Sequence, residues 1–178
     1  VGGGPVGLML ALLLARHGVA STVFNTAPEV RTNPKGSTHN ARTMEHYRRL
    51  GIAEKVRALG LPPDHPTDVA YFTRFTAWEL ARLPMASANT LRARRAAAPA
   101  TDQVPEPLHR ANQMYVEPLL FAEAGQRAPI TLRFGWEVES FTQDGACVTL
   151  EAAGPGGARE CWRAQYLVGC DGGRSFVR

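Results

Sequence analysis

The stretch VGGGPVGLML at residues 1–10 decides the fold of this chain. Gly2, Gly4 and Gly7 satisfy the pattern G-x-G-x-x-G, in which the first glycine permits a tight turn and the second lets the backbone approach a pyrophosphate. The third glycine lets the following helix pack closely against a sheet. Pro5 suits the first turn of that helix, because its missing N–H group would have no partner there. The stretch therefore predicts a phosphate-binding loop at a helix N-terminus.

The residues after the loop strengthen this prediction, since glycine clusters also occur in ordinary turns. Residues 5–17 are rich in leucine and predict a buried helix that ends at Gly18. Residues 19–24 then predict a short strand. A glycine loop that is followed by a helix and a strand is typical of a dinucleotide-binding site.

The rest of the chain continues the alternation of helices and strands. Helices are expected at residues 41–51, 52–60 and 113–126, and strands at 130–134 and 166–170. Residues 69–83 are expected to form a strand pair or a strand and turn, and residues 87–107 an exposed loop. The turns of a β-meander are expected at 143–146 and 154–157. This order predicts an α/β fold, a doubly wound parallel sheet of the Rossmann type with an inserted antiparallel β-meander. The first strand of such a sheet is central, and Val1 alone stands in front of the loop, so we expect an excerpt of a longer protein.

An amide stands where the dinucleotide-binding pattern has an acid. The pattern places Asp or Glu about 20 residues further on, at the end of the next strand, where it binds ribose hydroxyls. This position is Asn25, and the nearest acid is Glu29. An amide can donate to and accept from a hydroxyl, but without a charge the hydrogen bond is weaker. Asn25 is therefore predicted to make a weakened ribose contact.

A second motif, YLVGCDGGRSFVR, lies at residues 166–178. An apolar strand leads there into Asp171, Gly172 and Gly173. The glycines allow the backbone to approach a ligand closely, and Asp171 can accept hydrogen bonds from ribose or orient neighbouring loops. An ordinary D-G turn is the alternative.

Four segments together resemble a known family. GGGPVGL, NARTMEHYRRLGI, HRANQMYVEPLL and YLVGCDGGRSFVR, in this order, resemble the FAD-binding domain of the group A flavoprotein aromatic monooxygenases, which include the 4-hydroxybenzoate, phenol and polyketide hydroxylases. The resemblance covers nearly the whole chain and implies that residues 1–178 are one FAD-binding domain. It also implies that the first strand precedes Val1 and that the rest of the enzyme, with a second flavin motif, follows Arg178.

The resemblance implies a role for each matching residue. Those that would contact the nucleotides are Gly2, Gly4, Pro5 and Gly7 at the FAD diphosphate, Asn25 in place of a ribose-binding Glu, Arg42 at the diphosphate and the nicotinamide cofactor, Gln113, Val138 near the adenine, and Asp171 and Gly172 for both FAD and NAD(P)H. The planar guanidinium of Arg42 would bind phosphate oxygens at two points. The alternatives are a solvated arginine at 42, a polar residue that begins a helix at 113 and an apolar strand residue at 138. The sequence predicts no catalytic residue.

The activity implied by the resemblance is that of an FAD-dependent monooxygenase. NADH or NADPH would reduce the flavin, dioxygen would form a flavin hydroperoxide, and one oxygen atom would pass to a small aromatic substrate such as a phenol. The open alternatives are an FAD-dependent reductase or dehydrogenase of the same fold and a non-catalytic nucleotide-binding module. A dehydrogenase that binds nicotinamide alone is disfavoured, because it has no use for the D-G-G-x-S motif. The aromatic residues within 69–83 are expected to belong either to the core or to the substrate side.

The composition argues against several other classes of protein. Lys and Arg number 20 against 16 Asp and Glu, a net charge of +4, and the one dense arginine run at 92–95 lacks interleaved aromatic residues, so nucleic-acid binding is not expected. The apolar stretch at 6–15 is too short to span a bilayer, and no leader sequence is recognisable. The histidines and cysteines show no metal-binding spacing, and the cysteines are expected to be buried. We expect a cytoplasmic protein without a metal or a membrane span, and the oligomeric state stays open.

Overall fold

The computed structural model describes residues 1–33, 35–98 and 105–178, which form two units. The first unit comprises Val1–Asn33 and Glu117–Arg178, and the second comprises Pro34–Val116. One boundary between them follows Asn33, and the other falls within helix α5 (Gln113–Gly125), one of the predicted helices. Each unit has its own hydrogen-bonded strands.

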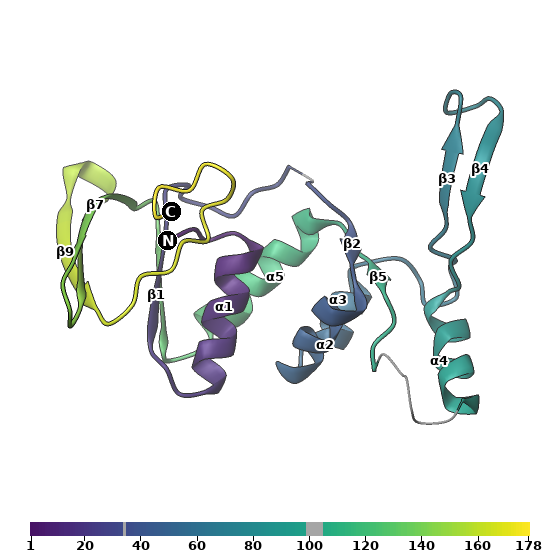
Figure 1. Cartoon of the computed structure of the whole chain (residues 1–178), viewed down its shortest axis with the longest axis horizontal. Coiled ribbons are helices and arrows are strands. Elements are labelled where there is room, and N and C mark those ends of the chain that lie inside the picture. Colours follow the sequence, from purple (N-terminus) through teal and green to yellow (C-terminus); the bar gives the residue numbers. More distant parts are fainter. Residues whose placement is uncertain (34, 99–104) are drawn as a thin grey trace. The chain divides into compact units, whose positions relative to one another are not determined.

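The first unit begins with a helix that packs on two parallel strands (Figure 1). Helix α1 (Pro5–Arg16) lies against β1 (Ser21–Asn25) and β6 (Ile130–Phe134), and the two strands pair in parallel along their whole length. Leu8 and Leu12 of α1 are fully buried, as expected for the apolar face of a helix against a sheet. The predicted helix and both predicted strands are confirmed.

Val1 and Gly2 extend the parallel arrangement beyond β1. The Val1 nitrogen donates to the Val168 carbonyl over 2.8 Å, and the Val1 carbonyl accepts from the Cys170 N–H over 2.7 Å, which is the hydrogen-bond pattern of a parallel pair. On the other side, the Gly2 N–H donates to the Phe24 carbonyl of β1 over 2.8 Å. Val1 and Gly2 therefore lie between β1 and the segment that contains Val168 and Cys170.

The sequence predicted more strand in this region than the structure contains. Residues 166–170 do not form a strand, and Tyr166 and Val168 are 83% and 47% exposed. This segment pairs with Val1, and one residue cannot satisfy the backbone groups of a whole strand. The prediction of a buried final strand is therefore wrong. The described residues form one parallel pair of strands, which is less than the doubly wound sheet that was expected.

Three consecutive antiparallel strands complete the first unit. They are β7 (Glu137–Gln143), β8 (Val148–Ala153) and β9 (Arg159–Ala164), hydrogen-bonded in that order. The predicted turn at 143–146 joins β7 to β8, and the Asp144 carboxylate accepts two backbone N–H groups there, at 2.7 and 2.8 Å. The sheet shares an apolar core with β1, formed by Phe24, Trp136, Val138, Leu150 and Ala152.

The second unit contains a short antiparallel pair of strands and two helices that the sequence predicted. Strand β2 (Thr38–His39) pairs with β5 (His109–Arg110), and α2 (Ala41–Arg49) is followed by α3 (Ala53–Ala58). Asn40 caps α2, because its side chain accepts a backbone N–H of the first turn over 2.9 Å. The two helices bury apolar side chains, namely Met44, Tyr47, Ala53 and Val56.

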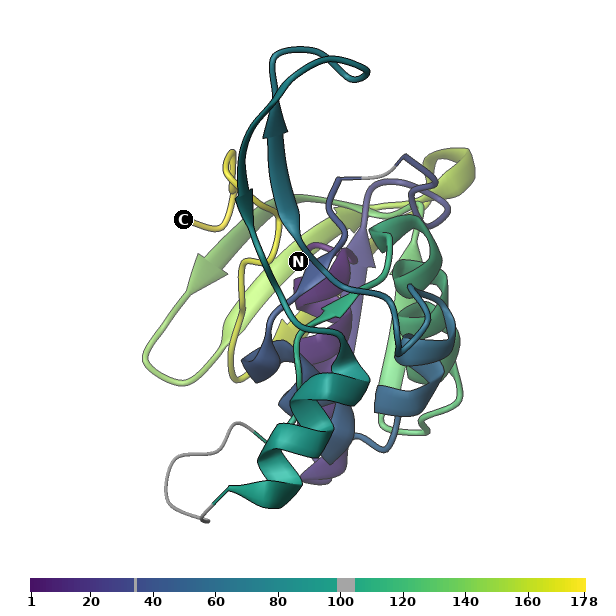
Figure 2. The same cartoon turned by 90° about the vertical axis from the view of Figure 1, so that its right-hand side faces the viewer.

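A β-hairpin extends from the second unit, away from that unit's helices (Figure 2). It consists of β3 (Val69–Phe72) and β4 (Glu79–Leu83), so of the two alternatives predicted at 69–83, a strand pair or a strand and turn, the strand pair forms. Phe75 and Trp78 near its tip are 99% and 82% exposed. These aromatic side chains therefore do not belong to a core within the described residues.

Helix α4 (Ala88–Ala97) lies where the sequence predicted an exposed loop. Alanine and arginine are strong helix formers, and the Ser87 side chain caps the helix by accepting the Thr90 N–H over 3.2 Å. The prediction relied on the scarcity of large apolar residues, which does not prevent an exposed helix from forming. Residues 99–104 of the predicted loop lie outside the described residues.

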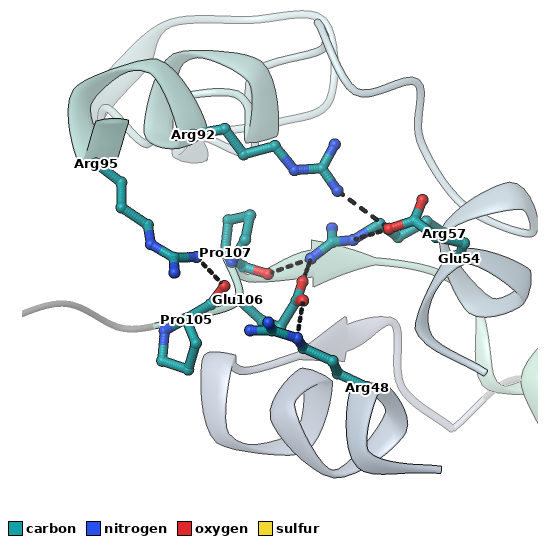
Figure 3. Close-up of polar contacts among 8 residues, drawn as sticks. All are labelled: Arg48, Glu54, Arg57, Arg92, Arg95, Pro105, Glu106 and Pro107. Atoms are coloured by element: carbon teal, nitrogen blue, oxygen red, sulfur yellow. Dashed lines mark hydrogen bonds and ion pairs between the residues drawn. The ribbon is translucent and has the colours of Figure 1, made fainter. Parts of the chain in front are cut away.

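Ion pairs connect α2, α3, α4 and the segment before β5 (Figure 3). Arg57 of α3 is buried and donates to the Glu106 carboxylate over 2.8 Å, and Arg48 of α2 lies 3.7 Å from the same carboxylate. Arg92 of α4 contacts Glu54 of α3 at 3.3 Å. Because an unpaired buried charge is costly, the buried Arg57 and Glu106 stabilise one another.

Candidate functional site

The glycine loop (Gly2–Gly7) packs against the D-G motif (Asp171–Gly173), which comes from the other end of the sequence. Gly2 has a φ of +101°, and a Cβ atom there would lie 2.4 Å from the Cys170 carbonyl oxygen and 2.7 Å from the Asp171 nitrogen. A Cβ atom at Gly7 would lie 1.9 Å from the Gly2 carbonyl oxygen. Glycine alone fits at these two positions. The structure therefore brings Gly2, Gly7 and Asp171 together.

The N-terminus of α1 is open at Gly4. Gly4 is the N-cap residue, no side chain caps the helix, and a Cβ atom added to Gly4 would meet nothing within 4 Å. Pro5 follows at the start of the helix, and its first turn holds no acidic residue. The amide groups of a first helical turn lack partners within the helix and, together with the helix dipole, favour an anion. Open space and unpaired donors fit the diphosphate of a dinucleotide here.

Asn25 binds the backbone of its own chain. Its Oδ1 accepts the Gly3 N–H over 3.1 Å, and its Nδ2 donates to the Ala27 carbonyl over 2.9 Å. Gly3 is itself tightly packed, since a Cβ atom there would lie 2.5 Å from the Phe134 ring. The amide at the end of β1 therefore holds the glycine loop. Sequence reasoning missed this contact and missed Gly3, because neither follows from the spacing of the glycines.

Asp171 holds the loop that follows it. One carboxylate oxygen accepts from the Ser175 hydroxyl over 2.6 Å, and the other accepts the N–H groups of Phe176 over 2.7 Å and Val177 over 3.4 Å. Burial raises the pKa of Asp171, but these hydrogen bonds outweigh burial, so the pKa lies below its usual value. Gly172 follows with a φ of +88°, which glycine adopts without strain. Asp171 thus orients a loop, one of the two roles that the sequence left open.

A cavity of about 430 Å³ opens in the first unit beside these loops. We call it the β7 cavity, and its lining residues are Val1, Thr26, Glu137, Val138, Glu139, Asp171 and Phe176. It brings together Val138 and Asp171, which the sequence predicted as site residues. The sequence did not predict the other lining residues, which are Val1, Thr26, Glu137, Glu139 and Phe176. Their one signal in the sequence is that they lie next to predicted residues or within the motif at 166–178.

In the second unit, Arg42 and Gln113 lie on neighbouring segments. Gln113 begins α5, and its N–H donates to the Gly36 carbonyl over 2.9 Å, just before β2 and α2. The Arg42 side chain on α2 is 70% exposed and forms an ion pair with Glu45 at 2.9 Å. Its guanidinium is therefore accessible to an anion in solution.

The three cysteines are free and none is buried, contrary to expectation, with Cys161 exposed and Cys147 and Cys170 partly exposed. Within the described ranges, no group of three His, Cys, Asp or Glu side chains could hold a metal ion. In that same part of the chain, no helix combines the length and the apolar character needed to cross a membrane.

Comparison with known sequences identifies relatives along the whole chain. The family described as FAD binding domain matches residues 1–178. The chain is 33% identical to the FAD-dependent monooxygenase apdD of Emericella nidulans, over all of this chain and 29% of that protein. It is 36% identical to aklavinone 12-hydroxylase RdmE of Streptomyces purpurascens, over all of this chain and 33% of that protein.

Solved structures give the same result. The flavin-dependent monooxygenase PieE, in complex with FAD and substrate, matches with a TM-score of 0.85 and 34% identity over 99% of this chain and 30% of PieE. The rebeccamycin biosynthetic enzyme RebC in its substrate-free form matches with a TM-score of 0.82 and 36% identity. The chain spans about a third of the length of these relatives. The fold is therefore the α/β fold of such domains, and the chain belongs to the FAD-binding-domain family.

Proposed function

We propose that the full-length protein is an FAD-dependent monooxygenase that hydroxylates an aromatic substrate. The proposal is supported by relatives that are named monooxygenases and hydroxylases. In the net reaction, the aromatic compound, dioxygen, NAD(P)H and a proton yield the hydroxylated compound, NAD(P)⁺ and water. FAD supplies the redox chemistry when it is bound, and the residues of this chain bind and orient it.

The observation that carries this proposal is the contact between the glycine loop and the D-G motif. Gly2 lies against Cys170 and Asp171, so the N-terminus of α1 and the loop after Asp171 border the same region of the first unit. We assign the FAD diphosphate to the α1 N-terminus at Gly4, Pro5 and Gly7. Asp171 and Gly172 then form a second wall of the nucleotide site.

Arg42 and Gln113 are further proposed contacts of the cofactors. The resemblance to the aromatic monooxygenases suggests both contacts. The exposure of the Arg42 guanidinium supports the contact proposed for Arg42. We propose that Arg42 binds the FAD diphosphate and receives NADH or NADPH, since a guanidinium binds phosphate oxygens in a planar two-point geometry. Gln113 would hydrogen-bond FAD from the start of α5.

The arrangement of strands suggests how this chain fits into the longer protein. Val1 and Gly2 lie between β1 and Val168, which is where the central strand of a doubly wound sheet would continue. We propose that residues 1–178 are part of such a sheet in the full-length protein. The hairpin at 69–83, with its exposed Phe75 and Trp78, is proposed to contribute to the substrate side.

The experiment that tests this proposal uses the purified full-length protein. We expect bound FAD, oxidation of NADH or NADPH that accelerates when a phenolic or polyketide substrate is added, and one atom of ¹⁸O from ¹⁸O₂ in the product. Substrate-dependent NAD(P)H oxidation without ¹⁸O in the product would indicate the reductase or dehydrogenase alternative. Bound FAD without any NAD(P)H oxidation would indicate a non-catalytic nucleotide-binding module.

A further inference from the structure

We infer that Glu137 binds the adenosine ribose of FAD, in the role that the dinucleotide pattern gives to the position of Asn25. The inference rests on the proposed function in one respect, namely that FAD is the bound nucleotide. It concerns the β7 cavity of the first unit, whose volume of about 430 Å³ lies within the range of ligand pockets, roughly 300–1,000 Å³.

The Asn25 side chain is already occupied by two backbone contacts. Its oxygen accepts from Gly3 and its nitrogen donates to Ala27, and Asn25 is not among the residues that line the β7 cavity. Each atom could make one further hydrogen bond, since an amide nitrogen carries two N–H donors and an amide oxygen has two lone pairs. The two contacts hold the side chain outside the β7 cavity, however, so turning it toward a ligand in the cavity would break them and loosen the glycine loop.

Three carboxylates line the β7 cavity, and two of them are engaged. Asp171 accepts three hydrogen bonds from its own loop. Glu139 forms an ion pair with Arg159 at 2.9 Å. The Glu137 backbone pairs with Ala153 in the sheet, but its side chain makes no hydrogen bond or ion pair with any other described residue. It is therefore the carboxylate of this cavity that is available to accept hydrogen bonds from a ligand.

Glu137 also lies near the position that the dinucleotide pattern reserves for the acid. The preceding residue, Trp136, donates its N–H to the Asn25 carbonyl over 3.1 Å, so β7 begins beside the end of β1. A carboxylate can accept from both hydroxyl groups of a ribose, and such charge-assisted hydrogen bonds are stronger than those of a neutral amide. The apolar side chains of Val1, Val138 and Phe176 in the same cavity suit the adenine ring.

The test compares Glu137→Gln with the wild-type full-length apo-protein in titrations with FAD and with FMN, which lacks adenosine. We expect the Kd for FAD to rise about tenfold or more, because a charged hydrogen-bond acceptor is lost, and the Kd for FMN to stay unchanged. Charge repulsion alone predicts a lower Kd for FAD in Glu137→Gln, since removing a negative charge near a diphosphate strengthens binding. Glu151→Gln, in the same sheet but outside the cavity, is the matched control and should change neither Kd.

A second titration identifies the group that Glu137 binds. An FAD analogue without the 2′-hydroxyl of the adenosine ribose should bind more weakly than FAD to the wild-type protein, with a smaller difference in Glu137→Gln. An equal difference in both proteins, or an unchanged Kd for FAD in Glu137→Gln, would overturn the inference while leaving the proposed function intact. A wild-type protein that binds no FAD would overturn both.

Discussion

Gly2 and Gly4 both belong to the glycine pattern, but the structure leaves no room for a side chain at Gly2 and leaves room for one at Gly4. The pattern assigns a turn to the first and cofactor approach to the second. Gly2 is packed against Cys170 and Asp171 with a positive φ, whereas Gly4 faces open space. The first glycine therefore serves the fold of this chain, and the second leaves room for a ligand.

The tight packing of Gly2 leads to a prediction about stability. Gly2→Ala should lower the free energy of unfolding of the full-length protein by about 2 kcal/mol or more, because it combines backbone strain at positive φ with a clash against backbone atoms. Urea denaturation measures the change. Gly145→Ala, in an open turn where an added Cβ would meet nothing within 4 Å, is the control. Equal stabilities of the two variants would show that Gly2 is not packed as described.

The exposed guanidinium of Arg42 leads to a prediction about cofactor binding. Arg42→Ala should weaken FAD binding or raise the KM for NAD(P)H about tenfold, as expected when a charged hydrogen bond to phosphate is lost. Flavin titration and steady-state kinetics of the full-length protein provide the two values. Arg49→Ala, which removes another exposed arginine of α2, should alter neither. If Arg42→Ala also alters neither, Arg42 does not belong to the site.

The roles of single residues could be predicted from the sequence only where they depend on neighbouring residues, and not where they depend on contacts between distant parts of the chain. The roles of Gly2, Gly4 and Gly7 in the loop could be inferred because the pattern is local. The hydrogen bond from Gly3 to Asn25 depends on how the glycine loop meets the end of β1, and the position of Glu137 depends on how β1 and β7 meet. The spacing of residues along the sequence reveals neither.

Among the elements, strong local signals led to correct predictions, whereas an exposed helix and a segment that pairs with a single residue were predicted wrongly. The leucine-rich α1 and the strands β1 and β6 form as expected, because burial and propensity agree. Helix α4 was missed because it is exposed and depends on a cap and on ion pairs rather than on an apolar face. Residues 166–170 have a strand composition, but they pair with Val1 and not with a full strand.

His109 in β5 leads to a prediction about how the free energy of unfolding depends on pH. Burial, and secondly the positive charge of Arg57, lower the pKa of His109 in β5 to about 4. Below pH 6.5 the unfolded chain binds a proton at His109 that the folded chain does not bind, so stability falls as the pH decreases from about 6.5 to 4. The loss at this site approaches about 3 kcal/mol.

His109→Gln removes this titration and should therefore show a weaker loss of stability with acid than the wild type. Urea midpoints at pH 7 and pH 4.5 provide the comparison, and His17→Gln, at an exposed position after α1, should behave as the wild type does. The same acid-induced loss in His109→Gln as in the wild type would mean that His109 is not held neutral in the folded protein.

For the chain taken together, the type of domain could be inferred from sequence, because four motifs in a fixed order imply one cofactor. The division into two units could not be inferred. One of its boundaries follows Asn33, and the other falls inside α5, where the helix continues on both sides of the boundary. The extent of the sheet was overestimated, since residues 166–170 pair with Val1 alone and do not form a strand.

The most direct measurement is the affinity of Gly4→Ala for FAD, in the full-length apo-protein, by flavin fluorescence titration. The backbone at Gly4 (φ −77°) suits alanine and the added Cβ meets nothing, so stability should change by less than about 1 kcal/mol. The methyl group would stand where the diphosphate approaches the α1 N-terminus, and the Kd for FAD should rise at least about tenfold. A folded Gly4→Ala protein with wild-type affinity for FAD would contradict the assignment of this loop as the FAD site.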